Sequence, residues 1–344
     1  MKTTRLTLAV AVAVGVSTLA ACSGSTATTA PSVAATTAAS AAASGGTGTA
    51  TGKNITLMVG VKGDPFYVSM QCGAQEAATA AGVKLNVQGP DKFDATLQNP
   101  MLDAVAASKP DALLVAPNDV KASVGPLKSM QDAGVKVVLV DTIVTDTTIG
   151  VSRIASDNEQ GGEQAAQALA TLGLAKGAKV LVISTDPGVS SVDARVAGFK
   201  KKGAELGFVL VSDTQYSHDV AATAAQVVSA ALAKDPDLAG VFATNLFTAQ
   251  GTSTGVKTAG KSGVVKIVGF DAGPDQIKQL QAGEVQALVA QEPYTIGLDG
   301  VQQAVAALNG QPVTATIATP SIVITKDNMN DPAVSKFIYK ANCG

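Results

Sequence analysis

Acidic, amide and aromatic side chains stand at the ends of several short apolar runs in this chain. They are Asp64, Phe66, Tyr67, Asp141, Asn245, Asp271 and Gln291. A carboxylate can accept hydrogen bonds from two adjacent hydroxyl groups, and an amide both donates and accepts. Aromatic rings can pack against weakly apolar C–H faces. These residue types together would suit a small ligand that is rich in hydroxyl groups, such as a sugar or a polyol.

The apolar runs are continuous rather than alternating, which is typical of strands that are buried on both faces. They span residues 55–61, 84–87, 112–115, 135–140, 179–183, 208–211, 240–243, 264–269 and 285–290. Segments with helical spacing lie between them, so the order is βαβα and predicts an α/β fold with parallel sheets covered by helices. Nine strands exceed one typical sheet, and residues 156–158 are polar and loop-like. We therefore expect two similar Rossmann-like lobes, with the ligand beyond the carboxyl ends of the strands.

The N-terminus has the parts of a secretory signal. Lys2 and Arg5 precede an apolar stretch, 6–19, that is too short for a membrane helix. The small residues before Cys22 resemble the lipobox of bacterial lipoproteins, in which the cysteine is lipidated and becomes the first mature residue. The alternative is an ordinary signal peptide with Cys22 near the cleavage site by chance. We expect a signal peptide at 1–21 and an extracytoplasmic protein that is lipid-anchored to the cell membrane.

Residues 22–53 form a second segment of unusual composition, almost wholly Ala, Ser, Thr and Gly. Such a segment buries too little apolar surface to offset its ordering entropy, so it is expected to be a disordered tether. Two further cysteines, Cys72 and Cys343, remain in an oxidising compartment, where they are expected to form one disulfide. Two separate buried thiols are the alternative.

Composition excludes several classes of function. The formal net charge is −2, and no basic patch is long enough to bind nucleic acid. The chain has a single histidine and no metal-ligand pattern, so we expect neither a metal site nor a cofactor. Residues 255–262 match the phosphate-binding P-loop pattern, but the run closes a predicted helix and precedes a strand. We therefore interpret this run as a helix C-terminus. The carbonyl end of a helix repels phosphate, so the run is not expected to bind a nucleotide.

Four segments together resemble the ribose-binding-protein branch of the periplasmic binding proteins, type I. They are 63–67, 154–158 with Gly161 and Gly162, 268–271, and 290–291, within a resemblance that covers about residues 54–326. The family has two Rossmann-like lobes joined by a three-strand hinge, and a cleft that closes on a sugar. It implies crossings near Ser156-Asp157, Gln291 and Ile322.

The crossings divide the chain into discontinuous lobes. The resemblance implies an N-terminal lobe of 54–156 and 292–322 and a C-terminal lobe of 157–291 and 323–330. Residues 331–344 are expected to form a tail that returns to the N-terminal lobe.

The resemblance also implies sugar contacts at particular positions. Phe66 and Tyr67 match two stacking aromatic residues, and Arg195 matches an arginine that binds hydroxyl groups. His218 or Tyr216 could fill a third aromatic position, where an insertion makes the register uncertain. The further matches are Asp64, Asp141, Asn245, Asp271 and Gln291.

Several of these residues have an alternative structural role. Phe66 could pack in the core, Asp64, Asp141 and Asp271 could cap the helices that follow them, and Arg195 and His218 could be solvated.

Three positions depart from the ribose-binding pattern. Ala116 stands where ribose binders have an amide, Thr142 where they have an arginine, and Leu246 where an aspartate is common. A site that lacks partners for particular hydroxyl groups discriminates poorly for them. A smaller polyol, a deoxy sugar or another pentose is therefore expected rather than ribose.

The expected function is that of a monomeric solute-binding lipoprotein. It would capture a monosaccharide or small polyol and deliver it to an ABC transporter permease with a separate ATPase. A receptor that presents a sugar-like signal, such as an autoinducer, to a membrane partner is the alternative. A hydrolase that uses a pair of these aspartates is disfavoured because the chain has no nucleophile elbow or Cys-His pair. A repressor of the lactose type is disfavoured because the N-terminus carries a signal and a tether instead of a helix-turn-helix.

Overall fold

The computed structural model of this protein describes residues 50–343. The predicted signal peptide, Cys22 and all but the last four residues of the predicted tether lie outside the described residues. Both sheets and their hydrophobic cores lie within residues 50–343, so a protein that starts at residue 50 contains the complete two-lobed fold.

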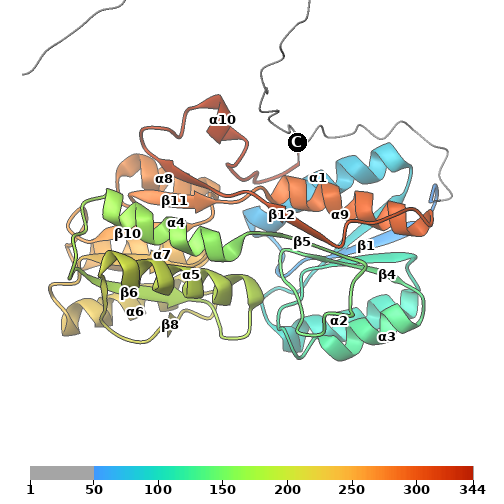
Figure 1. The fold of residues 1–344 in the computed structure, drawn as a ribbon, viewed down its shortest axis with the longest axis horizontal. Helices are drawn as coiled ribbons and strands as arrows, with labels where there is room; N and C mark the ends of the chain where they lie inside the picture. Colours follow the sequence, from blue (N-terminus) through green and yellow to red (C-terminus); the bar gives the residue numbers. More distant parts are fainter. Residues whose placement is uncertain (1–49, 344) are drawn as a thin grey trace, which may run out of the picture. The chain divides into compact units, whose positions relative to one another are not determined.

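The N-terminal lobe is built on a parallel sheet with the strand order β12-β5-β4-β3-β1-β2. Its strands are β1 (Asn54–Met58), β2 (Lys84–Gln88), β3 (Ala112–Val115), β4 (Lys136–Val140), β5 (Ser152–Ser156) and β12 (Thr316–Thr319). Its helices are α1 (Pro65–Ala81), α2 (Ala95–Ser108), α3 (Val124–Asp132) and α9 (Pro293–Leu308). Helices α1 and α9 cover one face of this sheet, and α2 and α3 cover the other (Figure 1).

The C-terminal lobe has the strand order β13-β11-β10-β9-β6-β7, with β8 also paired to β6. Its strands are β6 (Lys179–Ser184), β7 (Val209–Leu210), β8 (Gln215–Tyr216), β9 (Gly240–Ala243), β10 (Lys266–Phe270), β11 (Ala287–Ala290) and β13 (Ile322–Thr325). Its helices are α4 (Asn158–Thr171), α5 (Ser190–Leu206), α6 (Ala221–Lys234), α7 (Leu246–Thr258) and α8 (Pro274–Ala282), and α10 (Pro332–Ser335) follows β13. Strand β13 is antiparallel to β11, and the other pairings are parallel.

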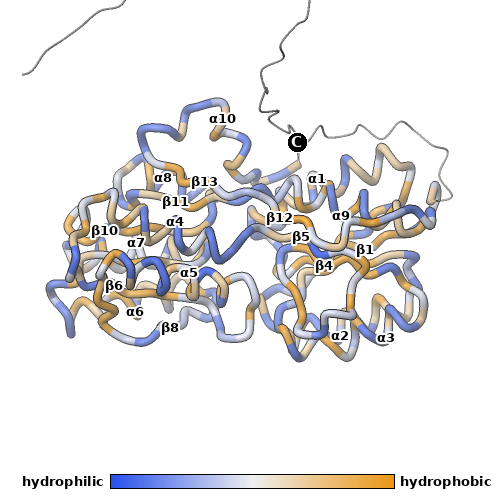
Figure 2. The backbone as a smooth tube through the Cα atoms, in the orientation of Figure 1, coloured by the Kyte–Doolittle hydropathy of each residue, from blue (hydrophilic) through white to orange (hydrophobic). Residues whose placement is uncertain are grey.

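This architecture confirms the predicted α/β class with two parallel sheets. The central strands β3, β9 and β11 are buried at every position, as their continuous apolar runs indicated. Figure 2 shows hydrophobic segments inside each lobe, β11 among them, while the surrounding helices also carry hydrophilic residues. Strand β5 alternates buried and half-buried residues, and β12 is largely exposed. The search for continuous apolar runs missed both strands for that reason, and it also missed β8 and β13.

The chain passes between the lobes at three neighbouring points. Strand β5 ends in one sheet, and α4 begins in the other lobe after Asp157. Strand β11 leads through Gln291 and Glu292 into α9, and β12 leads through Pro320 and Ser321 into β13. Ser156, which the sequence placed in a loop, is the last residue of a strand, because β5 pairs with β12 up to Thr319.

Two predictions about local chemistry are confirmed. Helix α7 ends at Thr258, within the P-loop-like run 255–262, and strand β10 follows it. The run therefore closes a helix and does not place free N–H groups around a phosphate. Cys72 and Cys343 form a disulfide, which joins α1 to the segment that follows α10.

Candidate functional site

A cavity of about 40 Å³ lies between the lobes, at the carboxyl ends of their strands. Eight of the nine residues predicted as ligand contacts line it: Asp64, Phe66, Tyr67, Asp141, Arg195, Asn245, Asp271 and Gln291.

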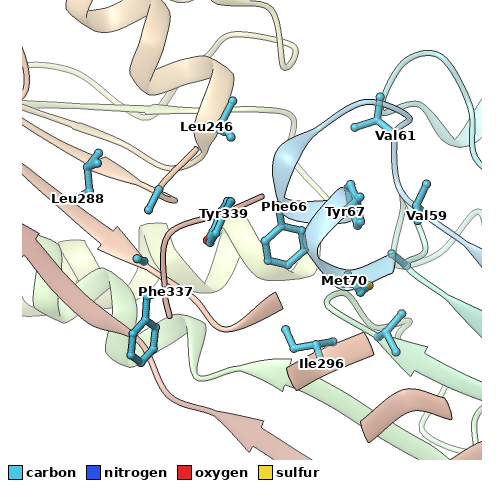
Figure 3. Packing of buried hydrophobic residues seen from close by; sticks show 14 of the residues in the cluster. Val59, Val61, Phe66, Tyr67, Met70, Leu246, Leu288, Ile296, Phe337 and Tyr339 are labelled. Carbon is cyan, nitrogen blue, oxygen red and sulfur yellow. The ribbon is translucent and has the colours of Figure 1, made fainter. Parts of the chain in front are cut away.

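The start of α1 supplies an acid and two aromatic rings to the cavity. Asp64 caps the helix, since its Oδ1 accepts a hydrogen bond of 2.8 Å from the backbone N–H of Phe66. Capping and lining the cavity are therefore compatible for Asp64. Phe66 and Tyr67 are buried with their ring planes at 86° to one another (Figure 3). Gly60 is required here, because a Cβ at that position would lie 2.3 Å from Tyr67 Oη.

Asp141 follows β4 and does not cap a helix. Its backbone is in the left-handed region, with φ of 65°, and its side chain is buried. The Tyr67 hydroxyl donates a hydrogen bond of 2.8 Å to Asp141 Oδ2. Tyr67 thus orients a carboxylate as well as presenting a ring.

Arg195 is held in place by three contacts in the C-terminal lobe. Its Nε donates to Asn158 Oδ1 at 2.9 Å, its Nη1 donates to the carbonyl oxygen of Thr244 at 3.0 Å, and its guanidinium lies 3.8 Å from the centre of the Phe270 ring. The two hydrogen bonds use two of the five N–H donors of the side chain. The arginine is therefore a rigid donor at the cavity wall rather than a solvated helix residue.

Close packing of α4 on α5 brings Asn158 to Arg195. A Cβ at Gly162 would lie 2.0 Å from the carbonyl oxygen of Arg195, and a Cβ at Gly198 would lie 2.0 Å from that of Glu159. Both positions therefore need glycine for the two helices to approach this closely.

Two pairs of polar side chains complete the C-terminal wall of the cavity. Gln291 Nε2 donates to Asp271 Oδ1 at 2.7 Å, and Asn245 Nδ2 donates to Asp219 Oδ1 at 2.5 Å. Asn245 also caps α7 by accepting from the backbone N–H of Thr248. Each pair fixes an amide against a carboxylate that faces the same cavity.

Three of the carboxyl groups that line the cavity, those of Asp64, Asp141 and Asp219, are difficult to ionise. Burial, followed by the charge of Asp271, raises the pKa of Asp64 well above its usual value. Burial raises the pKa of Asp141 to about 6, although the charge of Arg195 and the hydrogen bond from Tyr67 oppose this shift. Burial also raises the pKa of Asp219 to about 7, against the hydrogen bond from Asn245. Four carboxyl groups and one guanidinium line the cavity, so it is rich in acceptors and carries excess negative charge when the carboxyl groups are ionised.

The expectation for His218 needs correction. The side chain of His218 is 67% exposed, its Nδ1 lies 2.5 Å from Asp186 Oδ1, and it is not among the residues that line the cavity. His218 and Asp219 both have positive φ values, of 54° and 55°. This local turn brings the neighbouring acid, rather than the histidine, to the cavity. Tyr216 is exposed as well, and Phe93 is the third aromatic residue at the cavity among those described.

Sequence reasoning overlooked several residues that line the cavity, notably Phe93, Thr185, Ser191, Val192 and Asp219. Signals for three of them were present. Thr185 directly follows β6, as the other candidates follow their strands. Ser191 and Val192 precede Arg195 by four and three residues, so they share its face of α5. Phe93 lies in the connection between β2 and α2, where no pattern marked it.

Hydrogen bonds across the mouth of the cavity join the two lobes. The backbone N–H of Val120 donates to the carbonyl oxygen of Gly188 at 3.0 Å, and that of Ile143 donates to Ser190 Oγ at 2.9 Å. Val120 and Ile143 belong to the N-terminal lobe, and their partners belong to the C-terminal lobe. The structure therefore has the lobes closed on one another.

Comparison with protein families identifies the family to which this chain belongs. The family model described as "Periplasmic binding protein domain" matches residues 55–312, which is most of the chain. This chain belongs to the periplasmic binding protein family. The family consists of substrate-binding proteins rather than enzymes, which agrees with the predicted class of protein.

Individual relatives belong to sugar transport systems. The ribose import binding protein RbsB of Escherichia coli (strain K12) is 33% identical over 265 residues, which are 76% of this chain and 86% of the relative. RbsB of Bacillus subtilis (strain 168) is 30% identical over 267 residues, 77% of this chain and 85% of the relative.

Solved structures that resemble this chain are also solute-binding proteins of ABC transporters. A solute-binding protein of an ABC transporter from Agrobacterium vitis, bound with α-D-tagatopyranose, is 43% identical with a TM-score of 0.81, and the match covers 84% of this chain and 99% of that one. Another from the same species, bound with D-fucose, is 30% identical with a TM-score of 0.79, over 83% and 100% of the two chains.

Two further observations concern residues 50–343 alone. No helix in this part of the chain combines the length and apolar character that a membrane crossing needs. Its His, Cys, Asp and Glu side chains form no group of three or more that could hold a metal ion.

Proposed function

We propose that this protein captures a monosaccharide or small polyol in the cavity between its lobes and delivers it to the permease of an ABC transporter. A separate ATPase would drive the import. The two lobes close around a ligand by a hinge motion at the three crossings. Sugar transport by the relatives and the chemistry of the cavity support the proposal.

The main support for this proposal is the excess of hydrogen-bond acceptors over donors among the side chains that line the cavity. The carboxyl groups of Asp64, Asp141, Asp219 and Asp271 all accept hydrogen bonds, and an ionised carboxylate can only accept, whereas among the described residues at the cavity Arg195 is the one cation. A ligand must therefore supply several donors from adjacent positions, and the hydroxyl groups of a sugar do so.

Two buried polar atoms at the cavity strengthen the argument. Gln291 Oε1 and Thr185 Oγ1 have no hydrogen-bond partner in the structure, and both residues line the cavity. An unpaired buried polar atom costs about 1–3 kcal/mol. Hydroxyl groups of a bound ligand would satisfy both atoms, which favours a neutral polyhydroxylated ligand over an apolar one.

The departures from the ribose-binding pattern guide the choice of sugar. Thr142 Oγ1 donates to the carbonyl oxygen of Pro117 at 2.7 Å, and neither Thr142 nor Ala116 lines the cavity. The two donors that ribose binders have at these positions are thus lacking. Related structures carry D-tagatose, D-fucose and D-arabinose. We propose a ketohexose, a deoxy sugar or a pentose other than ribose.

A thermal-shift screen of a protein that starts at residue 50 tests the proposed ligand class. The panel contains D-tagatose, D-fucose, D-arabinose, D-ribose, D-allose, tetritols and pentitols. A ligand at about 1,000 times its dissociation constant adds about 4 kcal/mol of stability, so we expect a rise in Tm of several degrees for one of these classes. Sucrose at the same concentration controls for the general effect of an excluded osmolyte. If no sugar raises Tm beyond sucrose, the sugar assignment fails and a receptor for another signal becomes the leading hypothesis.

We further propose that Cys22 carries a lipid that anchors the protein, as a monomer, outside the cytoplasm. Radiolabelled palmitate should enter the full-length chain in a bacterial host and should not enter the Cys22→Ser variant. Cys72→Ser is the matched control, and its labelling should equal that of the parent chain. Equal labelling of all three chains, or of none, would contradict the lipoprotein assignment.

A further inference from the structure

The segment after α10 connects the two lobes, in addition to the three crossings of the main fold. On the side of the C-terminal lobe, the backbone N–H of Tyr339 donates to the carbonyl oxygen of Ala272 at 3.0 Å. On the side of the N-terminal lobe, the backbone N–H of Lys340 donates to Ser69 Oγ of α1 at 2.7 Å. The disulfide from Cys343 to Cys72 then ties the end of the segment to α1 covalently. We call residues 336–343 the C-terminal strap.

Tyr339 of the strap contacts ligand-cavity residues from both lobes, although it does not itself line the cavity. Its hydroxyl donates to Asp271 Oδ1 at 2.8 Å and accepts from the backbone N–H of Gln291 at 3.2 Å. Its ring meets the Phe66 ring edge-on, with 5.7 Å between the centroids. Figure 3 shows Tyr339 on the strap beside Phe66, and its side chain is 3% exposed.

Asp271 depends on such support because its own backbone is in an uncommon conformation. Its φ is 76°, in the left-handed region that non-glycine residues rarely adopt, and its side chain is buried. Tyr339 Oη and Gln291 Nε2 both donate to Oδ1 of this carboxylate. They fix its plane, so that Oδ2 is left to accept from a ligand.

We propose that Tyr339 is a positioning residue for ligand binding, which orients Asp271 and Gln291 from behind the cavity wall, and that the disulfide keeps it there. The inference rests on the proposed function, since it treats Asp271 and Gln291 as ligand contacts. The strap thereby couples α1, which supplies Phe66 and Tyr67 to the cavity, to the acid and amide of the opposite lobe.

Tyr339→Phe tests the proposal because it removes the hydroxyl and keeps the ring. Isothermal titration with D-tagatose, or with the sugar that gives the largest thermal shift, should show binding weakened about tenfold. Tyr294→Phe is the matched control. It removes a hydroxyl that donates to Glu76 on the surface, so binding should be unchanged. In an Asp271→Asn background, Tyr339→Phe should cause a clearly smaller further loss, because most of the effect passes through Asp271 and the rest through Gln291. Unchanged affinity of Tyr339→Phe, or an equal loss in both backgrounds, overturns the proposal.

A second measurement needs no ligand and so separates this inference from the proposed function. In protein labelled with 13C at the aspartate side-chain carboxyl, the resonance that Asp271→Asn removes identifies Asp271. That resonance should move in Tyr339→Phe and in the double variant Cys72→Ser/Cys343→Ser, and should stay in place in Tyr294→Phe. If it stays in place in Tyr339→Phe, the positioning role is wrong whether or not any sugar binds. If the Asp271 resonance moves in Tyr339→Phe but stays in place in the double variant Cys72→Ser/Cys343→Ser, the proposed role of the disulfide is wrong. If it moves but no sugar binds the parent protein, the fault lies with the proposed function.

Discussion

Replacement of Arg195 with leucine is expected to weaken sugar binding by about 1,000-fold. The guanidinium is the one cation among the described residues at the cavity, and Asn158, Thr244 and Phe270 hold it in place before any ligand arrives. A donor that needs no reorganisation contributes its full strength to binding, and hydrogen bonds to charged groups contribute about 1.5–3 kcal/mol each. Loss of two such bonds, about 4 kcal/mol, corresponds to the stated factor.

The same substitution should also destabilise the ligand-free protein by about 3 kcal/mol. Removal of one member of a buried ionic group leaves the opposite charges uncompensated. Here Asp141 loses the charge of Arg195, which opposes the rise in its pKa. Asn158 Oδ1 and the carbonyl oxygen of Thr244 lose a donor as well. Urea unfolding monitored by circular dichroism measures this change.

Arg153→Leu is the matched control for both effects. Arg153 donates to backbone carbonyl oxygens near residue 149, away from the cavity, and the substitution changes the net charge equally. Binding by Arg153→Leu should stay within a factor of about two of the parent. If Arg195→Leu binds as tightly as Arg153→Leu, the arginine plays no part in ligand capture and the proposed site is wrong.

The stability of the ligand-free protein is expected to rise as the pH falls from 8 toward 4. The folded-state pKa of Asp141 is about 6 and that of Asp219 about 7, both above the ordinary value of 3.8. At pH 8 both groups are ionised in the folded and in the unfolded state. Burial of the two charges in the folded state then carries a cost, which lowers the free energy of unfolding. As the pH falls through the folded pKa values, the native protein takes up protons before the unfolded chain does, so the cost disappears by about pH 4. For Asp141 alone the change is about 3 kcal/mol.

Other carboxyl groups act in the opposite direction but at lower pH. Hydrogen bonds and ion pairs lower the pKa values of Asp111, Asp146, Asp237 and Glu205, mostly at exposed positions. Their contribution is present above the unfolded pKa and is lost as the pH falls below it. We therefore expect maximum stability between about pH 4 and 5, with a decline on either side, in urea unfolding measured at unit steps of pH.

Sugar affinity should follow the opposite trend between pH 8 and 5. Protonation removes acceptors from Asp141 and Asp219, so hydroxyl groups of the ligand lose partners as the ligand-free protein becomes more stable. Asp219→Asn should raise the free energy of unfolding at pH 8 and flatten its dependence on pH. Asp213→Asn, an exposed acid in the same segment, should change neither. A pH dependence that is equally steep in Asp219→Asn would show that this carboxylate is not the source.

Most candidate site residues were predictable because the ends of buried parallel strands are marked in the sequence. Runs such as 112–115 and 240–243 are apolar at every position, and they became strands with the predicted bounds. The side chains that follow such runs must meet at one edge of a sheet, which is why Asp64, Asp141 and Asp271 could be named in advance. Strands β5 and β12 could not be found in this way, because one has polar alternation and the other lies at a sheet edge.

The choice between His218 and Asp219 illustrates a limit of local pattern. Both side chains lie in one short turn, and only the backbone angles of that turn determine which one reaches the cavity. Phe93 lies in the connection between β2 and α2, and its ring packs against Gly60, which is distant in the sequence. Neither feature has a periodic signature.

Periodicity and strand ends in the chain were thus sufficient for the two α/β lobes and for the edge at which ligand contacts gather. They suffice because burial on both faces and the rule for parallel strands act over a few residues at a time. The pairing of Cys72 with Cys343 followed from the number of cysteines and the predicted secretory signal. Tertiary structure alone decided that four carboxyl groups and Arg195 line one cavity, with raised pKa values for Asp64, Asp141 and Asp219, and that Tyr339 donates a hydrogen bond to Asp271. Burial and Coulomb interactions between residues far apart in the chain depend on distances that no local pattern encodes.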